Sequence, residues 1–298
     1  MGRVAVGVPS TASAAMIGRE IRPNERREAP MSFDRINGIA LHHRVDGPEG
    51  APTLVLINSL GTDYRIWDAV VPMLAGRYRV IRYDKRGHGL SEVPPAPYRM
   101  EDHAADLLAL LDHYAVGEAL AVGLSIGGQI GLGLAAIDQN RLAGLVLMDT
   151  AHKIGDAAGW NGRITAIETD GIASIADQIL SRWFTPAFRS PDNPAFRGYT
   201  SMLVNSPSQG YIGSCAALRD ADHTETARNL EVATLCMVGD QDGSTPPDLV
   251  KACADLIVGA KFEIVEGAGH LPCIEQPERT ARLIGDFAGE IFGNGAAS

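Results

Sequence analysis

One short segment combines residue types that together could activate a nucleophile. Ser125 is flanked by glycines in the run Gly123-Leu124-Ser125-Ile126-Gly127. In this G-x-S-x-G pattern the serine sits on a sharp turn from a strand into a helix, and the glycines let the backbone pass at close range. A largely apolar segment, 118–124, precedes the serine and another, 126–137, follows it, which is the order of strand, turn and helix that the pattern requires. The segment therefore predicts a serine nucleophile for acyl transfer.

A serine hydroxyl also needs a histidine to take its proton and a carboxylate to orient that histidine. The predicted base is His270, because it lies between the last apolar strand and the last helix, at the sheet edge expected to carry Ser125. The predicted acid is Asp242, the outer carboxylate of the loop 239–246, whereas Asp240 is expected to bond its own loop. Asp240 and Asp149, the latter at the end of an earlier strand, stay alternative acids.

Acyl transfer further requires N–H groups that point at the developing oxyanion. One is predicted to be the backbone N–H of Ile126, directly after the serine. The second is predicted to be that of Leu60, in the loop Asn58-Ser59-Leu60-Gly61-Thr62 after the first central strand. An ordinary polar turn is the alternative interpretation of this loop.

Strands and helices must alternate along the chain to bring these residues to one edge. Asn37-Gly38 between alternating apolar residues predicts an opening hairpin over 33–45. Apolar strands are then expected at 53–58, 78–84, 118–124, 144–149, 234–239 and 262–265, and helices at 101–114, 126–137, 247–258 and 277–292. This order predicts an α/β fold with a mostly parallel central sheet, opened by an antiparallel hairpin and covered by helices on both faces.

The strand signal disappears between residues 150 and 229, where helical periods occur at 160–168, 172–183, 194–204 and 209–218. We expect a helical cap over 151–228, inserted into a core of 31–150 and 229–293, with a purely stabilising helical layer as the alternative. Residues 1–30 are expected to be a disordered extension and 294–298 a tail. Met31 is an alternative start of translation.

Composition limits the classes of partner. The chain has 298 residues, 45% hydrophobic and 21% charged, with a net charge of -10 and no basic cluster, which disfavours nucleic acids and anionic membranes as partners. The uncharged run 119–137 is long enough to cross a bilayer, but its glycines favour a buried strand and helix. The four cysteines are expected to be reduced thiols of a cytoplasmic protein. No metal-binding spacing is present, so we expect neither metal nor cofactor.

With these residues placed, the chain resembles the α/β hydrolases and, among them, the 3-oxoadipate enol-lactonases. The resemblance runs from about Phe33 to Phe292 and rests on four segments, which are residues 58–63 (NSLGTD), 82–91 (RYDKRGHGLS), 239–247 (GDQDGSTPP) and 269–277 (GHLPCIEQP). The second segment is structural in many hydrolases, so His88 is given no catalytic role.

The resemblance implies hydrolysis of 3-oxoadipate enol-lactone to 3-oxoadipate, a step of the bacterial β-ketoadipate pathway of aromatic catabolism. Since this substrate carries a free carboxylate, the candidate cations in the cap are Lys153, Arg163 and Arg182, with Trp160 as an apolar wall beside them. The alternative is that each is a surface or packing residue. The alternatives are another carboxylesterase or lactonase on the same scaffold and, more remotely, a non-catalytic receptor for a small ligand. The sequence leaves open whether the chain forms a homo-oligomer.

Overall fold

The chain enters its sheet through a tight hairpin. In the computed structural model, which describes residues 1–2 and 32–293, β1 (Ser32–Ile36) pairs antiparallel with β2 (Ile39–Asp46). Asn37 and Gly38 between the strands have φ values of 48° and 81°. Two consecutive positive φ angles characterise the type I′ turn, which Asn-Gly adopts at low cost. The predicted hairpin is confirmed.

A single eight-stranded sheet forms the centre of the molecule. Its order is β1-β2-β4-β3-β5-β6-β7-β8, and every pair from β4 onward is parallel. The remaining strands are β3 (Thr53–Ile57), β4 (Arg79–Tyr83), β5 (Ala119–Leu124), β6 (Leu142–Met148), β7 (Thr234–Gly239) and β8 (Lys261–Val265). The predicted mostly parallel sheet, opened by an antiparallel hairpin, is therefore confirmed.

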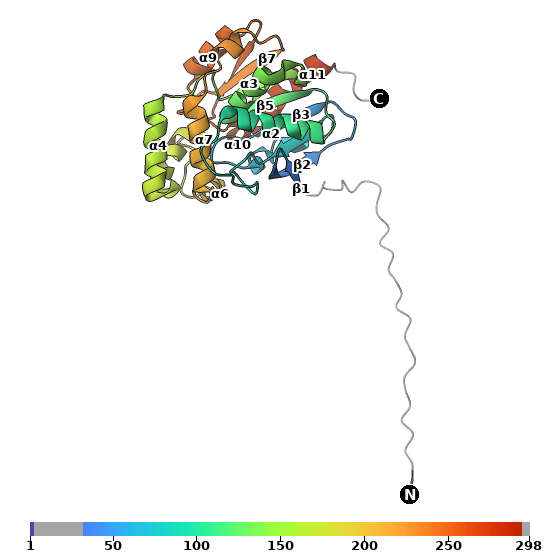
Figure 1. The fold of residues 1–298 in the computed structure, drawn as a ribbon, viewed down its shortest axis with the longest axis vertical. Coiled ribbons are helices and arrows are strands. Elements are labelled where there is room, and N and C mark those ends of the chain that lie inside the picture. The colour runs from blue at the N-terminus through green and yellow to red at the C-terminus, as the bar shows by residue number, and fades with distance from the viewer. Residues whose placement is uncertain (3–31, 294–298) are drawn as a thin grey trace.

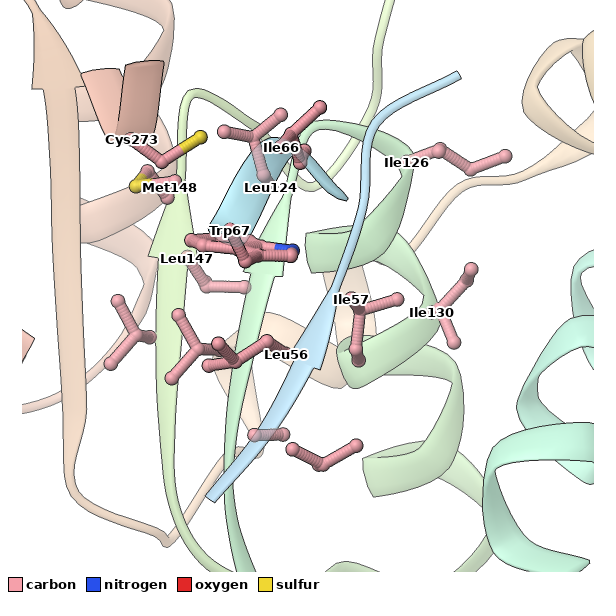
Figure 2. Close-up of a cluster of buried hydrophobic side chains, with 14 of the residues drawn as sticks. Leu56, Ile57, Ile66, Trp67, Leu124, Ile126, Ile130, Leu147, Met148 and Cys273 are labelled. Carbon is pink, nitrogen blue, oxygen red and sulfur yellow. The ribbon is translucent and has the colours of Figure 1, made fainter. Parts of the chain in front are cut away.

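Both faces of the central strands are apolar. All residues of β3 and β5 are buried, and successive side chains along a strand point to opposite faces. In Figure 2, Ile57 lies toward Ile126 and Ile130 of α3, whereas Leu56 and Trp67 lie on the other side of the strand. A strand that is buried on both faces has to be covered by helices on both faces.

The helices of the core follow the strands in alternation. α2 packs on α3, and α1 packs on α11. Their bounds are η1 (Tyr64–Trp67), α1 (Val71–Leu74), α2 (Met100–His113), α3 (Ile126–Asp138), η2 (Gln139–Arg141), α9 (Pro247–Leu256), α10 (Pro272–Glu275) and α11 (Pro277–Phe292). The four-residue elements η1, α1 and α10 were not predicted, because a single turn is too short to show a helical period.

A group of helices, here called the cap helices, lies between β6 and β7 in the chain. They are α4 (Ala157–Asp170), η3 (Ile172–Ile175), α5 (Ala176–Trp183), α6 (Pro194–Val204), α7 (Ser208–Asp220) and α8 (Thr224–Arg228). Figure 1 shows α4, α6 and α7 gathered at one side of the sheet, on the left of the view. The single helix expected over 172–183 is divided in two, because Ile175 leaves the helical conformation with ψ of 3°.

Three further expectations concern the two ends of the chain and the uncharged run 119–137. The extension at 1–30 with the alternative start at Met31, and the tail at 294–298, fall almost wholly outside the described residues. The uncharged run 119–137 folds as β5, a turn and α3. Within residues 1–2 and 32–293, no helix has the length and the apolar character needed to span a bilayer.

Candidate active site

Ser125 occupies a strained turn between β5 and α3. Its φ and ψ are 59° and -119°, a combination that non-glycine residues rarely adopt and that is common at functional sites. The turn is held by the Ser125 N–H, which donates to the Met148 carbonyl at 2.9 Å, and by the Thr150 hydroxyl, which donates to the Ser125 carbonyl at 2.7 Å.

The two flanking glycines are required by close contacts. A Cβ on Gly123 would overlap the Gly127 carbonyl, and a Cβ on Gly127 would overlap the carbonyl of Ile57 in β3. Larger residues would therefore push the turn away from the sheet. The local geometry is that of a nucleophile elbow.

His270 and Asp242 form a buried pair beside this turn. Nδ1 of His270 lies 2.9 Å from Oδ2 of Asp242, and both side chains are almost completely buried. Asp242 also accepts hydrogen bonds from the N–H groups of Ser244 and Thr245 and from the Thr245 hydroxyl at 2.7 to 3.1 Å. Burial acts to raise the Asp242 pKa, but His270 and these donors outweigh it and lower the pKa below its usual value. An ionised Asp242 fixes the proton on Nδ1 and leaves Nε2 as the basic nitrogen.

The other two candidate carboxylates have different partners. Oδ1 of Asp149 accepts from the Gly239 N–H at 2.9 Å, and its pKa is raised well above the usual value by burial and by the charge of Asp242. Asp240 accepts from the Ala268 N–H at 3.1 Å. The expectation that Asp240 bonds its own loop is therefore wrong, because its loop lies against the loop that carries His270.

The two loops that carry His270 and Asp242 are also tied to the cap helices. The His270 N–H donates to the Trp183 carbonyl at 2.8 Å, and the Gly243 N–H donates to the Arg182 carbonyl at 3.2 Å. Both acceptors lie at the end of α5. The end of α5 therefore holds together the loop that carries Asp242 and the loop that carries His270.

The two backbone N–H groups predicted to bind an oxyanion have no backbone acceptor within the described part of the chain. The Ile126 N–H is the first of α3, so it has no carbonyl partner within the helix. Leu60 lies in the loop after β3, and within the described chain its N–H donates to no other residue. Leu60, Ser125 and His270 line one cavity of about 400 Å³.

The cap helices supply most of the remaining cavity wall. Trp160, Arg163 and Arg182 line it, and the Arg163 guanidinium carbon lies 4.9 Å from the centre of the Trp160 ring. Lys153 does not line it, because its ammonium group pairs with exposed Asp222 at 3.0 Å. The structure thus brings Trp160, Arg163 and Arg182 to the cavity and leaves Lys153 outside.

Other residues that line the cavity were not predicted from the sequence. They include Tyr211 and Trp183 from the cap helices and Thr245 from the loop that carries Asp242. The two aromatic residues gave no usable signal, because a helical period shows that a helix has an inner face but not which cavity the face meets. Thr245 stands three residues after Asp242, a spacing at which a threonine hydroxyl often bonds the carboxylate. That local pattern could have identified it.

Carboxylate and imidazole groups converge at two places in the described chain. One is Asp149, Asp242 and His270, where Nδ1 of the histidine is already bonded to Asp242. The other is Asp34, His43 and His113, where Nε2 of His43 lies 3.1 Å from Oδ2 of Asp34. The four cysteines are free and buried, as expected for reduced thiols.

Comparison with known proteins agrees with this geometry. Residues 52–277 match the family model of the alpha/beta hydrolase fold. Two 3-oxoadipate enol-lactonases of Acinetobacter baylyi are each 33% identical, over 80% and 85% of this chain and 90% and 95% of their own lengths. The crystal structure of the enol-lactonase from Burkholderia xenovorans has a TM-score of 0.83 at 34% identity and covers 86% of this chain and 99% of that one. The chain therefore belongs to the α/β-hydrolase fold family, within which its similarity to the enol-lactonases makes it an ester-hydrolysing enzyme.

Proposed function

We propose that this enzyme hydrolyses 3-oxoadipate enol-lactone to 3-oxoadipate, as a step in bacterial aromatic catabolism through the β-ketoadipate pathway. The observation that supports the chemistry best is the 2.9 Å contact between His270 Nδ1 and Asp242 Oδ2 at the wall of the cavity that holds Ser125. It leaves Nε2 of His270 free to act as a base. The relatives named 3-oxoadipate enol-lactonase support the choice of substrate.

In the proposed first step, Ser125 Oγ attacks the lactone carbonyl while His270 Nε2 accepts its proton. The N–H groups of Ile126 and Leu60 donate to the oxyanion of the tetrahedral intermediate. When this intermediate collapses, the ring C–O bond breaks and the leaving oxygen departs as an enolate, which takes the proton from His270 so that Nε2 is again a free base. An enolate is a better leaving group than a simple alkoxide, and its protonation and tautomerisation to the ketone draw the reaction forward.

In the second step, water attacks the acyl-enzyme and gives its proton to His270. When the second tetrahedral intermediate collapses, His270 returns this proton to the Ser125 oxygen and the new carboxylate is released, so that one water is consumed for each lactone opened. Asp242 stabilises the imidazolium that forms in both steps, because it is ionised and bonded to Nδ1.

The cavity also provides a cation for the free carboxylate of this substrate. Arg163 is half-buried on the cavity wall, where its guanidinium stacks on the Trp160 ring. Stacking orients a guanidinium and leaves its edge available for a bidentate contact with a carboxylate. We assign Arg163 this contact, with Trp160 as its support and Arg182 as a second cation at the cavity.

The test is the loss of ultraviolet absorbance of enzymatically generated enol-lactone after addition of the purified protein. Ser125→Ala and simple p-nitrophenyl esters are measured in parallel. Rapid lactone loss that depends on Ser125 supports the proposal. Brisk cleavage of the esters without lactone loss would reject the substrate and keep the chemistry, and Ser125→Ala with full activity would reject the mechanism.

A further inference from the structure

A lysine is buried beneath the cavity, where a charged side chain is uncommon. Lys85 follows β4 and is 1% exposed, although lysines are almost never fully buried without a partner. Its Nζ donates a hydrogen bond of 2.6 Å to the carbonyl oxygen of Ser59. The proposed mechanism gives this lysine no role.

The Ser59 carbonyl collects an unusual number of donors. Besides Lys85, it accepts from the Thr62 hydroxyl at 2.8 Å, the Thr62 N–H at 3.3 Å and the Asn58 side-chain amide at 3.5 Å. A carbonyl oxygen has two lone pairs, so four donors crowd it. The orientation of the peptide group between Ser59 and Leu60 is therefore fixed from the side of the oxygen.

The N–H of that same peptide group belongs to Leu60. The peptide bond is trans, since Ala96-Pro97 is the one cis bond in the described chain. In a trans peptide the C=O and N–H point in opposite directions. With the oxygen held by Lys85 on one side, the Leu60 N–H points to the other side, where Ser59 and Leu60 line the cavity with Ser125.

We propose that Lys85 is a positioning residue whose ammonium group holds and polarises the Ser59–Leu60 peptide, so that the Leu60 N–H binds the oxyanion more strongly. This inference rests on the proposed function, because it assigns Leu60 to the oxyanion. A hydrogen bond accepted by a carbonyl oxygen strengthens the donor at the other end of the same amide. The benefit is largest in the transition state, when the oxyanion carries its charge, so it raises kcat more than it lowers KM.

The charge of Lys85 depends on pH in the neutral range. Burial lowers its pKa to about 7, against the opposing effect of the Asp84 and Asp63 carboxylates. The other titratable groups that interact with it are the imidazoles of His88 and His103, whose pKa values are held well below normal by burial and by nearby positive charge. Both histidines are therefore neutral where Lys85 titrates, and they do not add a charge change of their own.

The test compares Lys85→Met, which removes both the charge and the donor, with Lys85→Gln, which keeps a neutral donor. We expect kcat on a p-nitrophenyl ester to fall by about 10- to 100-fold in Lys85→Met, with KM within about twofold, and to be intermediate in Lys85→Gln. Thermal unfolding of each variant shows that it is folded. Lys251→Met, which removes an exposed lysine that pairs with Asp255 on α9, is the control and should match the wild type.

The decisive readout is the ratio of wild-type kcat to Lys85→Met kcat across pH, measured at the isosbestic wavelength of p-nitrophenol. The remaining residues of the site are the same in both enzymes, so a pH dependence that they share drops out of the ratio. The ratio should be high at about pH 6 and fall as pH rises through about 7.

If both variants keep wild-type kcat at every pH while Ser125→Ala is inactive, the inference about Lys85 is wrong and the proposed mechanism stands. If Ser125→Ala is active, the mechanism fails first.

Discussion

The carboxyl groups of Asp149 and Asp242 meet behind the His270 ring, with one oxygen of each and a ring nitrogen all within 4.8 Å of one another. Of these two acids, Asp242 is the one hydrogen-bonded to the ring, which the Thr245 hydroxyl also contacts at 3.4 Å, while Asp149 is held by the Gly239 N–H. Two buried carboxylates at this range cannot both ionise cheaply. The directions of their pKa shifts agree with a division of roles in which Asp242 carries the charge and Asp149 the proton.

Replacing each of these acids by its amide should separate the two roles. Asp242→Asn should lower kcat by about 10³- to 10⁴-fold, because the amide no longer selects the proper tautomer of His270. Asp149→Asn should keep most of the activity, since an amide resembles a protonated acid and can still accept from Gly239. Steady-state kinetics on the enol-lactone measures both. A larger loss in Asp149→Asn than in Asp242→Asn would make Asp149 the catalytic acid.

The raised pKa of Asp149 also predicts how stability depends on pH. A carboxyl whose folded pKa exceeds its unfolded value of about 3.9 stabilises the fold fully below that pH, and the contribution is lost as pH rises through the folded pKa. The amide introduced by Asp149→Asn cannot ionise, so the free energy of unfolding of this variant, relative to the wild type, should increase between about pH 4 and pH 8. Urea titrations over this range measure the difference. A difference independent of pH would mean that Asp149 titrates normally.

Arg163 and Lys153 provide a matched pair of cationic cap residues, one on the cavity wall and one outside it. Arg163→Met should raise KM for the carboxylate-bearing lactone by about tenfold or more, as expected for a lost hydrogen bond between charged groups. It should leave KM for a neutral ester nearly unchanged. Lys153→Met should affect neither substrate, because its exposed pair with Asp222 contributes little. Equal effects of Arg163→Met on both substrates would argue against a carboxylate contact.

A contact between glycines fixes how α7 rests on the core. A Cβ at Gly210 would overlap the carbonyl oxygen of Gly87, in the loop after β4. We expect Gly210→Ala to lower the free energy of unfolding by about 1–3 kcal/mol, the usual cost of overpacking. Gly198→Ala in α6 is the control, since its Cβ meets no atom within 4 Å and alanine should stabilise that helix by up to about 1 kcal/mol. Urea denaturation measures the free energy of unfolding of both variants. Similar values would contradict the close contact inferred between Gly210 and Gly87.

The parts of the fold that could be predicted from sequence are those whose signals are local. The hairpin turn at Asn37-Gly38 and the elbow at Ser125 each depend on a few adjacent residues. The pairing of Asp242 with His270 could be predicted as well, because the ends of parallel strands meet at one edge of the sheet.

Features that depend on packing between distant segments could not be predicted. Arg163 and Lys153 were equivalent candidates in the sequence, and only the way α4 lies over the core separates them. Likewise, the partner of Asp240 belongs to another loop. Lys85 stands in a segment rich in charged and polar residues, and nothing in that segment indicates that its ammonium group is buried under the loop of Leu60.

The carbonyls of Arg182 and Trp183 have a consequence for how the enzyme can be altered. Because these carbonyls hold the backbones of Gly243 and His270, the loops of Asp242 and His270 reach their observed arrangement only when the end of α5 has docked. Catalytic activity during refolding should therefore report the arrival of the cap as well as completion of the sheet. A chimaera that takes its substrate preference from another hydrolase would keep α5 and exchange α4, which lines the cavity and, among the described residues, makes no backbone hydrogen bond to the loops of Asp242 and His270.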